Sequence, residues 1–334
     1  MMRLAQLTLA DEVPLATLPN PDMSENYAWC GYDPQQRVGF FCHLGRWSLD
    51  RQLWREQMYV YLPDKSVLAF RGFGRGDTAR GPAAGVQRQI CLEPGKRWSI
   101  HHHGPVQHLD AADLVKGPAL EPFVERLELD LEFTGDLAPF FYPGSDNTTW
   151  GNWHYEQVGS LRGRIAYDGR EYQLDGFAFR DHTRGPRDLK HFCGSNWIQG
   201  RLPDGRGFAL FQTWDNIDGR ISPGLCELTL TTADAVETAQ LIEYPAYESL
   251  DDLNRPLPIV FESSAGRVEI AGEPQNTMIF SASSRHEILL GAAWGRAPLV
   301  VAEQPLLLRV DGETGIGHAE RCRLMETEPA LKWV

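Results

Sequence analysis

Hydrophobic and polar residues alternate along most of this chain with the two-residue period of β-strands. The clearest run is VERLELDLEF at 124–133, where apolar residues take turns with Glu and Asp, so that one face of the strand is buried and the other is wet. Helical spacing is confined to short stretches such as ADLVKG (112–117) and AYESLDDLN (246–254). The pattern predicts an all-β, antiparallel protein.

Tight turns separate many of these runs. Asp-Gly pairs lie between strand-like segments and have the composition that two-residue type I′ turns require. We therefore expect a β-hairpin at each of four positions: Asp168-Gly169, Asp204-Gly205, Asp218-Gly219 and Asp311-Gly312.

A change in composition falls at PFFYPGSDNTTWGNW (139–153), which is rich in Pro, Gly, Asn, Thr and aromatic residues. Strand-like runs lie on both sides of it, and each side has the size of an ordinary domain. We therefore expect two β-domains, at 1–148 and 149–334. A single large sandwich is the alternative that the pattern leaves open.

The composition narrows the class of protein. Of the 334 residues, 42% are hydrophobic and 23% charged, as in ordinary globular proteins. The net charge of −13 speaks against nucleic acid, because phosphate binding needs a basic surface. The six cysteines form no C-x-x-C pair. Without a signal-peptide pattern or an apolar run near the ~20 residues of a membrane span, we expect a cytoplasmic protein with no integral membrane segment; a homodimer is compatible with the sequence.

The best-defined hairpin turns at Asp168-Gly169. Counting outward from a two-residue turn puts Glu156 opposite Asp181 and Tyr155 opposite His182. Because side chains alternate, the first pair lies on one face of the hairpin and the second pair on the other. The first face should also carry His154, Val158, Ser160, Arg162, Asp175, Phe177 and Phe179, and the second Gln157, Leu161, Ile165, Leu174, Ala178 and Arg180.

The opposed carboxylates Glu156 and Asp181 suggest proton chemistry. Like charges that face each other across a sheet repel, and a carboxyl group whose pKa is raised by an anionic neighbour and aromatic walls can donate a proton at neutral pH. The alternative is a solvated pair neutralised by the arginines of FRDHTRGPR (179–187), and a β-bulge would exchange the faces. Tyr155 and His182 form a second candidate acid–base pair.

The run His101-His102-His103 raises the question of a metal site. In a strand, His101 and His103 share a face and could join His108 or His154 as three imidazole ligands. The surrounding WSIHHHGPVQH has no defined ligand spacing, so a polar lining of a cavity or loop is the favoured interpretation. We predict no metal.

Tryptophans flank the charged segment in sequence. Most aromatic residues belong to the core, but walls of Trp and Phe beside a few polar groups also form sites for apolar ligands, and their faces stabilise cations. The tryptophans concerned are Trp150, Trp153, Trp197 and Trp214.

The hairpin carries a resemblance to a known family. Tyr155-Glu156-Gln157 and the later D-H-x-x-G-x-R pattern, matched by Asp181, His182, Gly185 and Arg187, resemble the AttH/carotenoid 1,2-hydratase superfamily, which includes hydroxyneurosporene synthase. The resemblance implies two tandem lipocalin-like β-barrel domains, addition of water to isoprenoid double bonds without an organic cofactor, and an acid at Asp181. Thr183-Arg184 departs from the small residue and aromatic residue that the family often has, which puts the substrate in doubt.

The sequence thus predicts a cofactor-free hydratase or dehydratase for an isoprenoid or similarly apolar alkene or alcohol, whose partner is a small hydrophobic substrate. A template for isomerisation or cyclisation and a non-catalytic carrier are the alternatives. We expect the catalytic residues to be Asp181, His182, Glu156 and Tyr155, and the substrate-binding residues to be Phe177, Phe179, Trp197, Trp214, Arg180 and Arg184.

Overall fold

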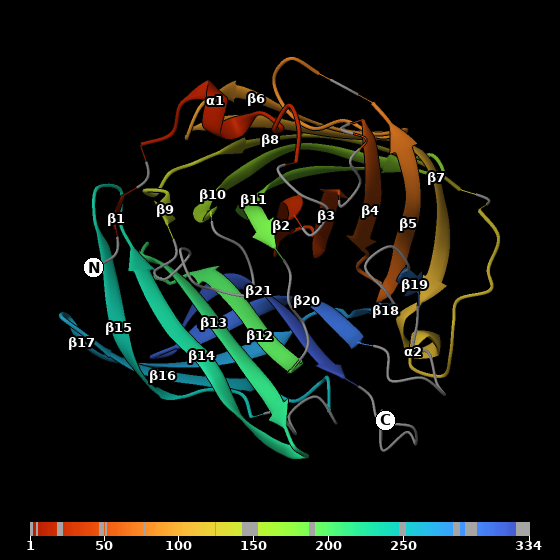
Figure 1. Cartoon of the computed structure of the whole chain (residues 1–334). Coiled ribbons are helices and arrows are strands. Elements are labelled where there is room, and N and C mark those ends of the chain that lie inside the picture. Colours follow the sequence, from red (N-terminus) through yellow and green to blue (C-terminus); the bar gives the residue numbers. More distant parts are fainter. Residues whose placement is uncertain are drawn as a thin grey trace.

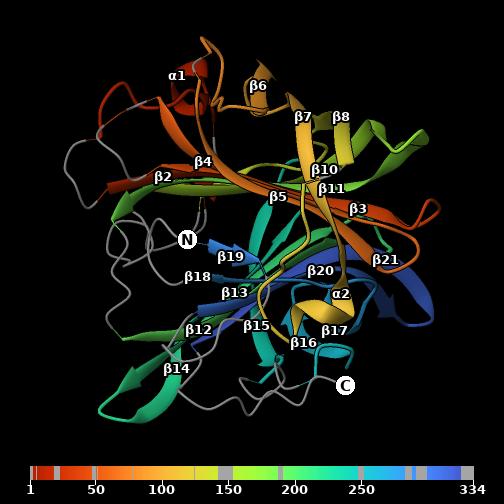
Figure 2. The same cartoon turned by 90° about the vertical axis from the view of Figure 1, so that its right-hand side faces the viewer.

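Two closed β-sheets make up the protein (Figures 1 and 2). The computed structural model describes residues 3–4, 6–18, 23–46, 50, 52–76, 78–123, 125–141, 153–186, 191–246, 252–282, 288–290 and 299–324. All strand pairings in both sheets are antiparallel, so the predicted all-β class is confirmed.

The first sheet closes into an eight-stranded barrel. Its circuit runs β10-β11-β2-β3-β4-β5-β7-β8 and returns from β8 to β10, while β6, β9 and β1 extend it at the edges. Its elements are β1 (Arg3–Leu4), α1 (Leu9–Glu12), β2 (Met23–Asp33), β3 (Val38–Arg46), β4 (Leu53–Tyr61), β5 (Ser66–Arg75), β6 (Gln87–Glu93), β7 (Arg97–Asp110), α2 (Ala111–Leu114), β8 (Glu125–Thr134), β9 (Phe140–Phe141), β10 (Trp153–Tyr167) and β11 (Arg170–Pro186).

The second sheet forms a similar ring. Its circuit runs β17-β16-β15-β14-β13-β12-β21-β20 and closes through pairing of β20 with β17, and β18 and β19 extend it beside β20. Its strands are β12 (Phe192–Arg201), β13 (Gly207–Ile217), β14 (Arg220–Thr231), β15 (Val236–Glu243), β16 (Leu257–Ser263), β17 (Gly266–Pro274), β18 (Met278–Ala282), β19 (Ile288–Leu290), β20 (Leu299–Val310) and β21 (Glu313–Leu324).

The chain passes from the first sheet to the second after β11, later than the predicted domain boundary. The predicted domain boundary at 148/149 lies outside the described residues, and β10 and β11, which follow it, still belong to the first barrel. The second sheet begins with β12, so the division between the sheets falls between Pro186 and Phe192.

Three of the four Asp-Gly pairs form the predicted two-residue turns. Asp168, Asp218 and Asp311 have φ values of 45°, 52° and 50°, and the glycines that follow them are also in the left-handed region, as type I′ requires. Asp204-Gly205 differs, because only the glycine has a positive φ and residues 202–206 form a longer connection between β12 and β13.

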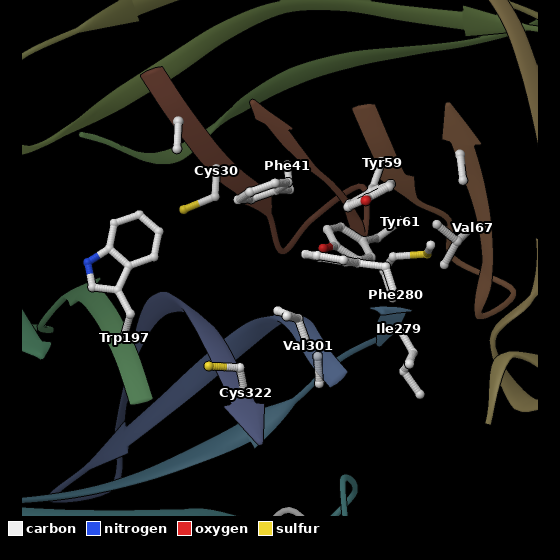
Figure 3. Packing of buried hydrophobic residues seen from close by; sticks show 14 of the residues in the cluster. Cys30, Phe41, Tyr59, Tyr61, Val67, Trp197, Ile279, Phe280, Val301 and Cys322 are labelled. Carbon is white, nitrogen blue, oxygen red and sulfur yellow. The ribbon is translucent and has the colours of Figure 1, made fainter. Parts of the chain in front are cut away.

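Buried apolar side chains fall into separate groups. One fills the first barrel and another the second. A third, which we call the inter-sheet cluster, draws side chains from both sheets, among them Phe41, Phe179, Trp197, Phe280 and Val301. Figure 3 shows members of this cluster, from strands of both sheets, facing one another across the space between them. Where the two barrels meet, the outward-facing side chains of their strands are therefore apolar and buried.

Neither of the two described helices, each of four residues, has the length or the apolar composition needed to span a bilayer.

Candidate functional site

The hairpin of β10 and β11 has the predicted register along its whole length. Glu156 lies opposite Asp181, and Tyr155 lies opposite His182, with no bulge between them. Phe179 on the first face belongs to the inter-sheet cluster, whereas Ala178 on the second face belongs to the interior of the first barrel. The predicted faces are therefore correct, and the four predicted catalytic residues divide between two environments.

Glu156 lies at the contact between the two sheets. Its side chain is fully buried, and the indole nitrogen of Trp197 on β12 donates a hydrogen bond of 2.7 Å to its Oε1 atom. The Trp197 ring packs edge-on against Phe179, with 5.5 Å between the ring centroids. An aromatic side chain of the second sheet thus bonds the carboxylate and packs against Phe179 of the first.

A chain of hydrogen bonds, which we call the relay, joins Glu156 to Asp181. Asp181 Oδ2 contacts the Thr183 hydroxyl at 3.0 Å, Thr183 contacts His154 Nδ1 at 2.6 Å, and His154 Nε2 contacts Glu156 Oε1 at 3.0 Å. Asp181 Oδ1 accepts a further hydrogen bond of 3.0 Å from the backbone N–H of Ala28. Asp181 is buried.

The relay needs one proton more than its neutral members supply. Three hydrogen bonds require three protons, and Thr183 and a neutral imidazole at His154 provide two. If both carboxylates were ionised, the third proton would have to make His154 a cation; otherwise Glu156 or Asp181 retains it. The relay therefore holds one exchangeable proton in any of its arrangements.

Glu227 on β14 adds a third carboxyl group, which the sequence analysis did not select. Burial and then the negative charge of Glu156 raise the pKa of Glu227 to about 7. Glu156 Oε2 and Glu227 Oε2 are both buried without a hydrogen-bond partner among the described residues. Because an unsatisfied buried polar atom costs about 1–3 kcal/mol, these two atoms mark a place where a ligand could bind.

The second face of the hairpin points into the first barrel. Arg180 lies there, fully buried, and donates hydrogen bonds to Gln157 at 3.0 Å, to the Tyr155 hydroxyl at 2.7 Å and to both oxygens of Glu12 at 3.1 and 3.2 Å. The Tyr155 hydroxyl in turn donates to Glu12. Arg180 and Tyr155 are therefore occupied by a carboxylate of the N-terminal helix α1.

His182 and Arg184 bind a second buried carboxylate, Glu25. His182 Nε2 lies 3.2 Å from Glu25 Oε1, and Arg184 Nε donates to the same oxygen at 2.9 Å. Burial, followed by the positive charge of Arg184, lowers the pKa of His182 to about 4. The two arginines do hold carboxylates in place, but these are Glu12 and Glu25 and lie away from the relay.

The remaining predicted residues are placed as follows. Phe177 belongs to the inter-sheet cluster. Trp214 lies in a small separate cluster with Cys193, and a register shift separates it from Gln212 in its strand. Trp150 and Arg187 lie outside the described residues.

The outer histidines of the His101–His103 run meet Asp130. His101 Nδ1 and His103 Nε2 each lie 2.8 Å from Asp130 Oδ1, and the three potential ligand atoms lie within 4.8 Å of one another. This arrangement could hold a divalent cation, but its residues are on β7 and β8, and Arg164 also contacts the Asp130 carboxylate at 3.3 Å. The trio contributes nothing to the relay.

The middle histidine provides a pH-dependent test of the barrel interior. Burial, and then the charge of His103, lowers the pKa of His102 to about 3. As the pH falls below 6.5, the unfolded chain therefore binds a proton at His102 and the folded chain does not, so acid favours unfolding. The contribution of His102 to the free energy of unfolding should fall by about 1.4 kcal/mol per pH unit between pH 6.5 and 3. Urea unfolding of wild type and His102→Phe at several pH values should show a shallower pH dependence in the variant; parallel curves would contradict the assignment.

The fold has relatives among solved structures. A Nitrosomonas europaea protein assigned to AttH (NE1406) matches with a TM-score of 0.59 and 14% sequence identity, over 96% of this chain and 99% of that one. CghA with Sch210972 matches with a TM-score of 0.56 and 8% identity, over 98% of this chain and 99% of that one. These matches confirm the AttH-like fold.

A sequence family described as a domain of unknown function (DUF7064) matches residues 8–325. No curated protein sequence matches the chain.

Proposed function

Because the chain belongs to the DUF7064 family, whose description names no reaction, we propose its function from the site between the sheets: a cofactor-free hydro-lyase that adds water to, or removes it from, an apolar alkene or alcohol of isoprenoid type. The observation that carries the proposal is the chain of hydrogen bonds from Asp181 through Thr183 and His154 to Glu156, which requires one proton more than its neutral members supply and ends at a buried carboxyl group bonded to Trp197.

Glu156 is the group that we assign to proton donation. Its Oε2 atom has no partner among the described residues, so it can face a substrate while Oε1 keeps its bonds to Trp197 and His154. Asp181 is the far end of the relay, held by the N–H of Ala28, and its side chain remains 11% exposed to solvent. After turnover Glu227 releases the proton that it took from water, and a proton from solvent passes through Asp181, Thr183 and His154 to Glu156. A positioned general acid contributes about 100- to 10,000-fold to a rate.

The other steps use groups that surround Glu156. Protonation of a trisubstituted alkene gives a tertiary cation, which the faces of Trp197 and Phe179 stabilise. Water then adds to the cation and gives its proton to the Glu227 carboxylate, whose pKa of about 7 suits a group that both accepts and releases protons at neutral pH. Tyr155 and His182, on the opposite face, support the hairpin from inside the barrel and do not touch the substrate.

The proposal is tested by isotope labelling in heavy water. Linalool and nerolidol, two isoprenoid alcohols, would be incubated with the protein and analysed by mass spectrometry for deuterium bound to carbon. Reversible protonation of the double bond predicts incorporation that depends on enzyme concentration. Binding of these alcohols without any incorporation would instead favour the template or the carrier.

A further inference from the structure

A second group of buried polar side chains faces the same inter-sheet space. It consists of Glu303 on β20, His318 on β21, Gln199 on β12 and Tyr61 on β4, and we call it the β20–β21 polar cluster. All four side chains are essentially inaccessible to solvent. The cluster thus draws on both sheets, as the relay does, and the steps proposed above do not use it.

The hydrogen bonds of this cluster leave donors and acceptors available. His318 Nε2 lies 2.7 Å from Glu303 Oε2. Four buried atoms have no partner among the described residues: His318 Nδ1, Glu303 Oε1, the Tyr61 hydroxyl and Gln199 Oε1. Gln199 Nε2 is engaged by Cys30 Sγ at 3.4 Å. Buried polar groups are usually hydrogen-bonded, so four unsatisfied polar atoms in one buried cluster point to a partner from outside the described chain.

The protonation of the Glu303–His318 pair follows from its surroundings. Burial, and then the charge of Glu320, raise the pKa of Glu303 well above its usual value, and burial lowers the pKa of His318 to about 3. When the proton of the Glu303 carboxyl group is on Oε2, it is donated to Nε2, which leaves the ring proton on Nδ1. His318 Nδ1–H is therefore a donor that seeks an acceptor, and Tyr61 can assist it.

The strand register places the backbone of this cluster two strands away from Trp197, the residue that bonds Glu156. Trp197, which bonds Glu156, lies directly opposite Glu320, and Glu320 lies directly opposite Glu303. Two strand spacings of about 4.8 Å separate the backbones of Trp197 and Glu303, or about 10 Å in all. Gln199, two residues after Trp197, lies opposite His318, so both polar centres adjoin the same strand β12.

Apolar side chains line the space between the two centres. Figure 3 shows Cys30 and Phe41 of the first barrel above Val301 and Cys322 of the second, with Trp197 at one side. The Phe41 ring is stacked on His318 at a centroid distance of 6.0 Å. From the relay to the β20–β21 polar cluster, the lining thus changes from polar to apolar and back to polar.

We propose that the β20–β21 polar cluster is a second binding subsite, and that the substrate is an elongated apolar molecule with a hydroxyl or carbonyl oxygen about 10 Å from the carbon that Glu156 protonates. The inference rests on the proposed function for the identity of the reacting end. The oxygen would accept from His318 Nδ1–H and bond the Tyr61 hydroxyl. A plain hydrocarbon would leave both groups unsatisfied, so the subsite selects against it.

The test compares ligands that differ in one polar end. Calorimetric titration would use α,ω-alkanediols of increasing chain length and primary alkanols of the same lengths. We expect diols that span both centres to bind about tenfold more tightly than the matched alkanol, which corresponds to one net hydrogen bond. Shorter diols should show no such advantage.

Variants of the subsite residues test whether the tighter binding of diols arises at this subsite. His318→Phe should remove the diol advantage, and Tyr61→Phe, which deletes only a hydroxyl, should remove part of it. His102→Phe is the matched control, since His102 is equally buried but belongs to the first barrel interior, and it should keep the advantage.

Three outcomes would overturn the inference: diols that bind wild type no better than alkanols, an advantage that survives both His318→Phe and Tyr61→Phe, or no binding of either ligand class. Failure of the hydro-lyase proposal would look different. In that case the diol advantage would be present but heavy water would leave linalool and nerolidol unlabelled.

Discussion

Glu156→Gln is expected to lower the rate of deuterium incorporation into linalool by about 100- to 10,000-fold, the usual contribution of a positioned acid. Glutamine can still accept the hydrogen bond from Trp197, so the wall of the site is preserved while the transferable proton is lost. The rate would be measured by mass spectrometry under single-turnover conditions, so that release of product does not mask the chemical step.

Two further measurements separate proton donation from a structural effect. In the form in which Glu156 is ionised, its charge raises the pKa of Glu227. Glu156→Gln removes that charge, so the pKa of Glu227 should fall from about 7, which a carbon-detected NMR titration of glutamate side chains would follow. Glu171→Gln, an exposed change on the same hairpin, should leave both the rate and that titration unchanged. A Glu156→Gln protein with wild-type labelling would show that the relay does not supply the proton.

The hairpin that carries the relay was predictable because local rules determine it. Asp168-Gly169 adopts the two left-handed conformations of a type I′ turn, and such a turn leaves no freedom in the pairing of the strands that follow. Counting outward from the turn places Glu156 opposite Asp181. The alternation of side chains then assigns each residue to one face of the hairpin. The interpretation of the pair as merely solvated is wrong, since Glu156 is fully buried.

The partners of this hairpin were not predictable, because they come from distant segments. Glu227 follows the alternation of its strand, with Leu228 and Leu230 inside the second barrel, and that pattern alone assigns it to solvent. It is half-buried, and its carboxyl group lies close enough to Glu156 of the first barrel for the charge of Glu156 to raise its pKa. In the same way, Glu12 interrupts an apolar run near the N-terminus, and no local signal shows that it enters the barrel to meet Arg180.

The arginines of the hairpin illustrate a general limit of sequence-based assignment. A charged residue next to a candidate site in sequence is readily assigned to substrate binding, as Arg180 and Arg184 were. Successive residues of a barrel strand point into the barrel and out of it. Where a second sheet covers the outside, as here, neighbours in sequence can belong to two separate buried networks. Arg180 is surrounded by Trp29, Trp98 and Tyr155 in the barrel interior, whereas Asp181 faces the other sheet.

Arg180→Met is expected to lower the free energy of unfolding by about 3–5 kcal/mol, the cost of leaving a buried charge without its partner. Glu12 is fully buried, and although burial tends to raise its pKa, the charge and hydrogen bonds of Arg180 lower the pKa below its usual value. Removal of the arginine leaves that carboxylate with the Tyr155 hydroxyl and the N–H of Gly95. Urea unfolding followed by tryptophan fluorescence would measure the loss.

Companion variants show whether the loss comes from the unpaired charge. The double variant Arg180→Met/Glu12→Gln removes both charges and should recover much of the stability, because desolvation of the pair opposes most of its attraction. Arg162→Met breaks an exposed cross-strand pair with Asp175, of 3.3 Å, and should cost less than about 1 kcal/mol. Equal losses for Arg180→Met and the double variant would mean that Arg180 stabilises the barrel through packing against its aromatic neighbours rather than through Glu12.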